Sequence, residues 1–202
     1  MRIEVFRGES AHAYKEFLSQ LPVKLDVFYH PEYLNSNANY TNSSWEVFYC
    51  TSENEFFVYP YLVETIYLEG LKFRDITSAY GYSGPACSSE TFGGAVELAF
   101  VEYCNDQAFV SEFVRYHYDP RLSYMFKINA EVLLNRKLVI LDLEQDWNTI
   151  WQNSFSKTNR NLVRKVENNG FRIATTEEIS VDRFSQLYRE HMTKKGAESF
   201  YY

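Results

Sequence analysis

Residues Trp45 to Glu64 read WEVFYCTSENEFFVYPYLVE. Two runs in this stretch, Trp45–Cys50 and Glu55–Glu64, are rich in the β-branched and aromatic side chains that favour strands, and a short polar segment separates them. The pattern predicts a β-hairpin that turns across Thr51–Asn54. The next apolar run, Leu71–Thr77, has the same character, so we expect the fold to be built on a sheet.

Further elements are predicted on both sides of the hairpin. Apolar patterns indicate short strands at 3–6, 109–115, 137–143 and 171–175. Helical spacing and capping residues indicate helices after Ser10, from Ser88 or Ser89 to about Asp106, from about Trp147 through 154–169, and at 181–195. A short helix is expected after His30-Pro31, and loops are expected at 35–44, 78–85 and 118–135.

The order of these elements decides the expected fold class. The β-α-β order at 139–174 suits a layered sheet whose strands are joined by crossover helices. We therefore expect an α/β protein, in which a mixed sheet is flanked by helices.

The charge is unevenly distributed along the chain. The net charge of the 202 residues is −7, but residues 1–150 hold 11 Lys and Arg against 21 Asp and Glu, whereas residues 151–202 hold 9 against 6. An acidic body disfavours general affinity for nucleic acid. The basic C-terminal quarter is suited to hold one phosphorylated substrate.

Membrane-spanning and disulfide-rich classes are disfavoured by the sequence. No stretch approaches the roughly 20 apolar residues that span a bilayer, and no N-terminal apolar run follows a basic segment, so we expect a cytoplasmic chain. The three cysteines, Cys50, Cys87 and Cys104, have neither the spacing of metal ligands nor the even number of a disulfide framework. We expect reduced thiols and no metal site.

The segment Ser78–Pro85 is the first candidate for a binding site. Gly81 and Gly84 allow a tight turn or the close approach of a ligand, and Tyr80 and Tyr82 offer hydroxyl groups or stacking faces to a sugar or base. The alternative is a glycine turn with packed tyrosines that joins a strand to the following helix.

The end of the strand predicted at 109–115 carries the second candidate. Because side chains alternate along a strand, Arg115 and His117 share one face and Glu112 lies on the other. Arg115 is suited to clamp a phosphate or carboxylate, and His117 to relay a proton near neutral pH. The alternative is an arginine paired with a nearby carboxylate and a half-buried histidine at a sheet edge.

A basic helix is the third candidate. Lys157, Arg160 and Arg164 follow the i, i+3 and i+4 spacing that places three cations on one stripe. This basic stripe is suited to a pyrophosphate or to the end of a tRNA, and the alternative is a solvated helix face. Asp75, Asp142 and Glu144 have no spaced partner, so we assign no general base.

Three motifs occur in order along the chain: DITSAYGYSGP at 75–85, FVRYH at 113–117, and NRKLVILDL at 135–143, which leads to SKTNRNLVRK at 156–165 and Gly170. From about residue 28 to the end, the chain resembles the N-terminal part of the FemAB-like branch of the GNAT-type N-acyltransferases. The resemblance implies two GNAT-like halves, each a mixed sheet flanked by helices. Residues 1–202 would form a single GNAT-like domain that stops before the second, because 198–202 resemble the start of another element.

The resemblance also implies a function. Relatives add amino acids to peptidoglycan precursors or N-acetylate amino sugars for surface polysaccharides. We therefore expect acyl transfer from acetyl-CoA or aminoacyl-tRNA to an amino group of a cell-envelope precursor, with a phosphorylated small-molecule or lipid-linked acceptor. The alternative is a noncatalytic module that presents the basic helix to a glycan, RNA or partner protein.

One departure from the GNAT pattern concerns the acyl donor. GNAT enzymes hold the coenzyme A pyrophosphate at a helix N-terminus through a Gln/Arg-x-x-Gly-x-Gly/Ala loop, where unpaired N–H groups form an anion site. No such segment occurs in this sequence. We expect the donor site to lie outside this chain, or the chain to use no coenzyme A.

Overall fold

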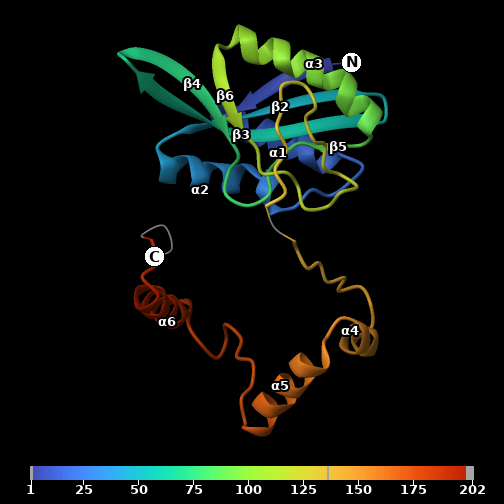
Figure 1. Ribbon diagram of the computed structural model, residues 1–202, viewed down its shortest axis with the longest axis vertical. Coiled ribbons are helices and arrows are strands. Elements are labelled where there is room, and N and C mark those ends of the chain that lie inside the picture. Colours follow the sequence, from blue (N-terminus) through green and yellow to red (C-terminus); the bar gives the residue numbers. More distant parts are fainter. Residues whose placement is uncertain (1, 136, 199–202) are drawn as a thin grey trace. The chain divides into compact units, whose positions relative to one another are not determined.

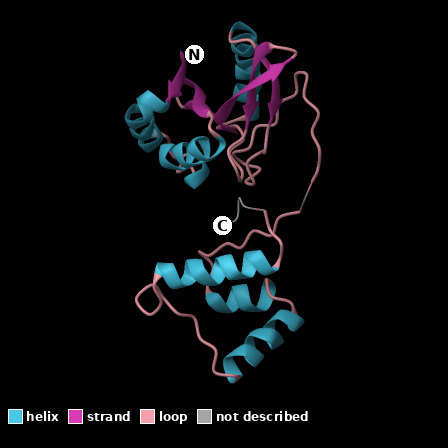
Figure 2. Ribbon diagram, turned by 90° about the vertical axis from the view of Figure 1, so that its left-hand side faces the viewer, coloured by secondary structure: helices cyan, strands magenta, loops and turns pink. Residues whose placement is uncertain are grey.

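The computed structural model describes residues 2–135 and 137–198. The chain forms two compact units, Met1–Leu138 and Val139–Tyr202. Within the described residues, all strands belong to the first unit, and the second contains helices and loops (Figure 2). Arg136, which belongs to the third motif, and residues 199–202, on which the expected next element depends, lie outside the described residues.

The first unit is built on one mixed sheet. Its strands are β1 Arg2–Arg7, β2 Ser44–Ser52, β3 Glu55–Leu68, β4 Leu71–Thr77, β5 Ala86–Cys87 and β6 Phe109–Phe113. The sheet order is β1-β2-β3-β4-β6, and β5 pairs with β3. Only β4 and β6 are parallel, and the chain between them passes through a helix, as parallel neighbours require.

The predicted hairpin is confirmed as β2 and β3. Ser52 pairs with Glu55, and Glu53 in the turn has a positive φ of 48°. β3 pairs with β5 at Phe57 and Val58 and with β4 from Leu62 onward. Pro60, which has no N–H to donate, therefore falls in the gap between these two pairings.

Helices cover both faces of the sheet (Figure 1). The first face packs against α1 Ala11–Gln20 and α2 Pro31–Thr41, and the second against α3 Glu90–Asp106. Two short 3-10 segments, Gly8–Ser10 and Val27–Tyr29, precede α1 and α2. The two apolar clusters that result are the core of the unit, and the α/β class with a mixed sheet flanked by helices is confirmed.

The loop predicted at 35–44 is wrong, because α2 continues to Thr41. Leu34 and Ala38 are one helical turn apart and both are buried against the sheet. Asn42 then ends the helix in the left-handed region, with a φ of 53°. The tertiary burial of one helix face outweighs the weak helix propensity of the Asn, Ser and Thr residues.

Within residues 139–198, the second unit contains three helices that begin at residues with side-chain caps. They are α4 Trp147–Asn153, α5 Lys157–Asn168 and α6 Val181–Lys194. The side chains of Asp146, Ser156 and Ser180 accept hydrogen bonds from the first turns. Gly170, with a φ of +76°, follows α5 and confirms the predicted αL-type end.

The strands predicted at 137–143 and 171–175 are wrong, and the β-α-β unit at 139–174 is not formed. Both segments are irregular chain, and side chains in them are exposed, such as Val139 at 97% and Ile173 at 92%. A strand needs a partner to satisfy its backbone groups, and no described strand pairs with either segment. The strand predicted at 109–115 exists but ends at Phe113.

Candidate functional site

The structure brings the first two candidate segments together at one end of the sheet. The N–H of Gly84 donates to the carbonyl of Arg115 at 2.8 Å, and the N–H of Arg115 donates to Ser78 Oγ at 2.8 Å. The N–H of Ser78 also donates to the carbonyl of Phe113 at 2.9 Å. Tyr80, Gly81, Tyr82, Gly84, Arg115 and His117 are therefore parts of one local structure.

Aromatic rings from four segments form a continuous cluster there, which we call the aromatic surface and which contains Phe28, Tyr33, Tyr82, His117 and Tyr118. The ring of Phe28 meets Tyr33 edge-on at 5.5 Å and Tyr82 at 5.9 Å. Tyr82 meets Tyr118 at 5.9 Å, and Tyr118 stacks on His117 at 4.5 Å. Tyr118 remains 37% exposed, so the surface is open to solvent.

Tyr80 lies beside this aromatic surface. Both backbone polar groups of Tyr80 are hydrogen-bonded. Its carbonyl accepts from Tyr33 Oη at 2.8 Å, and its N–H donates to Asn37 Oδ1 at 3.1 Å. Its side chain is 51% exposed. A fixed backbone with an exposed ring is a suitable geometry for stacking on a ligand.

The glycines of this loop are explained by packing. Gly81 has a φ of +98°, and a Cβ there would overlap the ring of Phe28. A Cβ on Gly84 would lie 2.6 Å from the Cα of Tyr116. Both glycines therefore permit close contact within the protein, which supports the glycine-turn interpretation for them and leaves the ligand contacts to the tyrosines.

His117 is held by hydrogen bonds on both ring nitrogens. Nδ1 accepts from the N–H of Asp119 at 3.0 Å, which assigns the proton of the neutral ring to Nε2, 3.1 Å from Asp26 Oδ2. His117 is 7% exposed. In this arrangement neither nitrogen is available to a substrate, so the residue positions the loop, and a proton relay is not supported.

Arg115 keeps an exposed guanidinium group. Its Cζ lies 4.8 Å from the ring centroid of Phe113, and Nη1 donates to the carbonyl of Ser78 at 3.4 Å. Most of its donors remain available, so the predicted role in binding an anion stays a prediction that the geometry permits.

The basic stripe belongs to the second unit. Arg160 Nη1 donates to the carbonyls of Trp151 and Gln152, both at 3.1 Å, and to that of Phe155. Arg160 thus satisfies carbonyl groups at the end of α4. Arg164 lies 5.7 Å from the ring of Trp151, whereas Lys157 is exposed. Two of the three predicted ligand-binding cations, Arg160 and Arg164, are therefore engaged inside their own unit.

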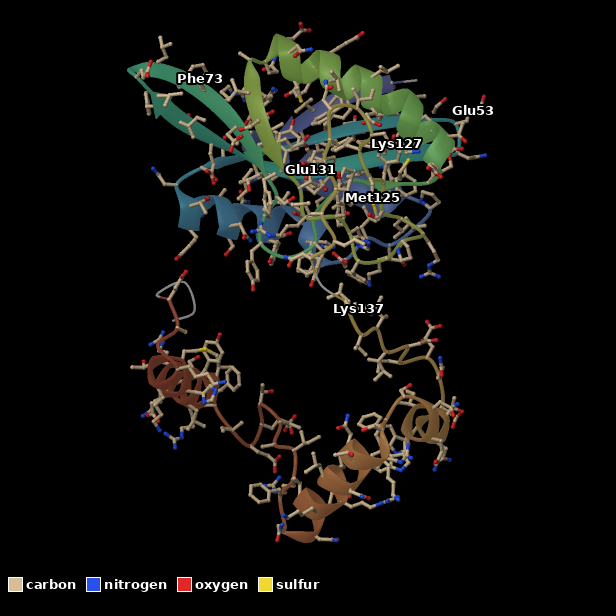
Figure 3. All side chains as sticks on the ribbon, viewed as in Figure 1. Glu53, Phe73, Met125, Lys127, Glu131 and Lys137 are labelled. Atoms are coloured by element: carbon tan, nitrogen blue, oxygen red, sulfur yellow. The ribbon has the colours of Figure 1, made fainter. Side chains whose placement is uncertain are left out.

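Two buried carboxylates of the first unit have structural partners. Glu46 accepts from Arg7 at 3.1 Å, Arg74 at 3.0 Å and Tyr103 at 2.6 Å. Glu97 accepts from Tyr124 Oη and from the N–H of Lys127, both at 2.5 Å, and so ties the loop after β6 to α3. Figure 3 labels Lys127 in this loop. Paired in this way, both groups hold the fold together.

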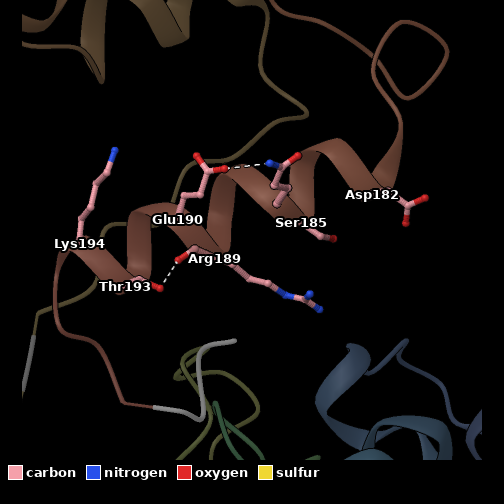
Figure 4. A pocket seen from close by; sticks show the side chains of 7 residues that line it. Asp182, Ser185, Arg189, Glu190, Thr193 and Lys194 are labelled. Carbon is pink, nitrogen blue, oxygen red and sulfur yellow. Dashed lines mark hydrogen bonds between the residues drawn. The ribbon is translucent and has the colours of Figure 1, made fainter.

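Metal and pocket geometry add no further candidate. No group of three or more His, Cys, Asp or Glu in residues 2–135 and 137–198 has the geometry to hold a metal ion. A hollow along α6 is lined by a single helix face whose residues bond to one another: Gln186 donates to Glu190 at 2.9 Å, and Thr193 to the carbonyl of Arg189 at 2.9 Å (Figure 4).

The sequence reasoning missed residues that complete the site. Asp26, Phe28 and Tyr118 were not singled out, although Asp26 precedes a short helical segment and caps it by accepting from the N–H of Phe28 at 3.0 Å. The capping pattern was a usable signal for Asp26. Its pairing with His117, which is 91 residues away, was not visible in the sequence.

Comparison with protein-family models, with curated proteins and with solved structures finds no match for the chain. None of the helices in the described part of the chain has the length and apolar character needed to cross a membrane.

Proposed function

We propose that the chain is the acceptor-binding part of an N-acyltransferase with a GNAT-like, FemAB-related fold. The acceptor is an amino-containing cell-envelope precursor, such as an amino-sugar nucleotide or a peptidoglycan intermediate. The observation that carries the proposal is the joining of two separate motifs, Ser78–Pro85 and 113–117, into one aromatic surface by direct hydrogen bonds.

The chemistry of this surface suits a sugar bearing a phosphate. Tyrosine rings offer apolar faces for the C–H side of a pyranose ring, and their hydroxyl groups offer polar contacts. The exposed Arg115 side chain, on the segment whose backbone bonds to Ser78 and Gly84, supplies a charged donor. N-acyl transfer depends largely on positioning an amine against an activated acyl group, so an acceptor site without a nucleophile is compatible with it.

The acyl donor would be acetyl-CoA or an aminoacyl-tRNA. No anion-binding glycine loop of the GNAT type occurs in the sequence. In this proposal the donor is bound by residues outside those that form the aromatic surface.

Ligand-induced stabilisation tests the proposal, because a ligand that binds only the native state raises its stability. An amino-sugar nucleotide such as UDP-glucosamine should raise the melting temperature, and Tyr80→Ala should weaken its binding about threefold to tenfold by removing one stacking ring. Tyr67→Ala is the matched control, because Tyr67 is 73% exposed at the distant tip of the β3–β4 hairpin.

The outcomes separate enzyme from binding module. Stabilisation by acetyl-CoA, together with acetylation of the amino sugar, supports the transferase. The absence of any response to acceptor or donor contradicts it. Lys157→Glu is the variant that examines the basic stripe, because Arg160 is engaged with α4.

The alternative is a noncatalytic binding module for glycans. The observation that favours it is the engagement of both His117 nitrogens, which leaves the aromatic surface with binding groups and no free imidazole base. Stabilisation by neutral glycans, with no effect of acyl donors, would support this alternative.

A further inference from the structure

The first unit contains a cavity that shares no residue with the aromatic surface. It has a volume of about 500 Å³ and is lined by the end of α1, by the turn that joins β2 to β3, and by residues of β1 and β2 beside that turn. Pockets that bind small organic ligands have volumes of roughly 300–1,000 Å³, so this cavity is large enough for such a ligand.

The floor of the cavity is apolar. Phe17 and Leu21 at the end of α1 line it together with two residues of the hairpin, Tyr49 and Phe56. Phe56 is 2% exposed and Tyr49 is 5% exposed, and the ring centroids of Phe17 and Tyr49 are 4.5 Å apart. All four side chains belong to the apolar cluster under α1 and α2 or pack against it. The floor is therefore formed in advance of any ligand, and it suits an apolar group.

The rim of the cavity carries charges of both signs. Arg2 Nε donates to one carboxylate oxygen of Glu4, whose other oxygen accepts from Tyr49 Oη at 2.5 Å. These bonds hold Arg2 beside Tyr49, and no described residue bonds to its two Nη groups. Glu53 lies in the hairpin turn with a φ of 48°, and its carboxylate has no partner among the described residues. One cation and one anion are therefore available to a ligand.

Sheet pairing brings these two charges to the same end of the cavity. Arg2 of β1 pairs with Thr51 of β2, and Glu53 follows Thr51 in the turn. Both charged side chains are exposed and long enough to reach a ligand above the floor. Glu55, the other acidic residue of the lining, accepts from Ser89 at 3.2 Å, so Glu53 is the carboxylate that remains free.

We propose that this cavity binds a free α-amino acid with an apolar side chain. The Nη groups of Arg2 donate to the carboxylate of the amino acid, the Glu53 carboxylate accepts from its ammonium group, and its side chain lies on the apolar floor. Such a ligand has one charge of each sign, as the rim does. The site goes beyond the acyltransferase proposal, because it is defined by binding and stands if no acyl transfer occurs.

Amide NMR of the full isotope-labelled chain both measures binding and locates it. L-phenylalanine should shift the amide signals of 17–21 and 51–56 and leave those of 78–85 unchanged. Phenethylamine lacks the carboxylate and phenylpropionate lacks the amine, so each should bind about tenfold more weakly through the loss of a charged hydrogen bond. Glycine, which has both charges but no apolar side chain, should also bind more weakly than phenylalanine.

Two variants assign the charges of the ligand to the two side chains. Arg2→Gln should weaken the binding of phenylalanine about tenfold and leave that of phenethylamine unchanged, because phenethylamine has no carboxylate. Glu53→Gln should weaken the binding of phenylalanine about tenfold and leave that of phenylpropionate unchanged, because phenylpropionate has no amine. Glu102→Gln, on the exposed side of α3, is the control and should leave the binding of all three ligands unchanged.

The outcomes are separable from folding and from the proposed acceptor site. Arg2 and Glu53 are exposed, so both variants should keep the fold, which their ligand-free amide spectra verify. Equal binding of the three ligands, amide shifts confined to residues outside the cavity, or unchanged phenylalanine binding in both variants would overturn the site. The experiment uses no amino sugar and no acyl donor, so its failure would leave the acyltransferase proposal standing.

Discussion

The two units of the chain carry similar amphipathic patterns but differ in what covers their apolar faces. In the first unit both faces of the sheet are covered, and its large aromatic side chains are buried in two clusters. In the second unit Ile150 is the only buried residue within 139–198, while Phe184 on α6 is 61% exposed. A local amphipathic pattern is therefore enough to form a helix, whereas a hydrophobic core needs a second layer of structure.

The largest expected difference between the units is in the cost of removing an aromatic ring. Phe100 of α3 is 2% exposed and stacks on Phe126 at 5.3 Å, so Phe100→Ala should destabilise the first unit by about 3–5 kcal/mol. Phe184→Ala, the matched change in α6, should cost less than about 0.5 kcal/mol. Urea unfolding followed by circular dichroism measures both, and equal costs would mean that α6 has a packed face.

A glycine in each unit gives the next largest contrast. Gly84→Ala should lower the free energy of unfolding by about 1–3 kcal/mol, because the new Cβ would lie 2.6 Å from the backbone of Tyr116. Gly170→Ala should cost about 1 kcal/mol, because Gly170 has a φ of +76° but no atom within 4 Å of the added Cβ.

Ligand binding separates these two glycine variants further. Gly84→Ala moves the two segments of the aromatic surface apart and should weaken amino-sugar binding, whereas Gly170→Ala changes only the end of α5. Thermal melts without UDP-glucosamine report the stability of each variant, and the shift in melting temperature on its addition reports binding. Similar loss of binding in both variants would contradict the assignment of the site to the first unit.

A third expected difference is a pH dependence of stability that belongs to the first unit. Loss of solvation raises the folded pKa of Glu112 to about 7, above its unfolded value of 4.5, so the folded state binds more protons between these values. Its contribution to stability is therefore present below pH 4.5 and is lost as the pH rises through about 7. Glu112→Gln should flatten the decline of the urea midpoint over this range.

Asp119 provides the control for that experiment. Arg121 holds the pKa of Asp119 down, to about 2, so its contribution is present above the unfolded value of 3.8 and is lost only as the pH falls through about 2. Asp119→Asn should leave the slope of the urea midpoint against pH unchanged between pH 4.5 and 7. If Glu112→Gln has the same slope of urea midpoint against pH as the wild type, Glu112 is not the cause of the pH dependence.

The parts of the fold that were predicted correctly depend on neighbours in the sequence. The hairpin of β2 and β3 is closed by a short turn, and α3 and α5 begin where Ser89 and Ser156 accept hydrogen bonds from N–H groups three residues ahead. Such contacts are encoded within a few residues. The candidate loop Ser78–Pro85 was recognised for the same reason, since its glycines and proline mark a turn locally.

The hairpin, the capped helices, and Tyr82 and His117 of the aromatic surface could be predicted from the amino-acid sequence, because capping, turn chemistry and periodicity act over short distances. Only the tertiary structure decided that α2 extends to Thr41, that 137–143 and 171–175 form no strand, and that Asp26 meets His117. The physical reason is that burial and strand pairing depend on residues distant in the chain, whose approach no local pattern specifies.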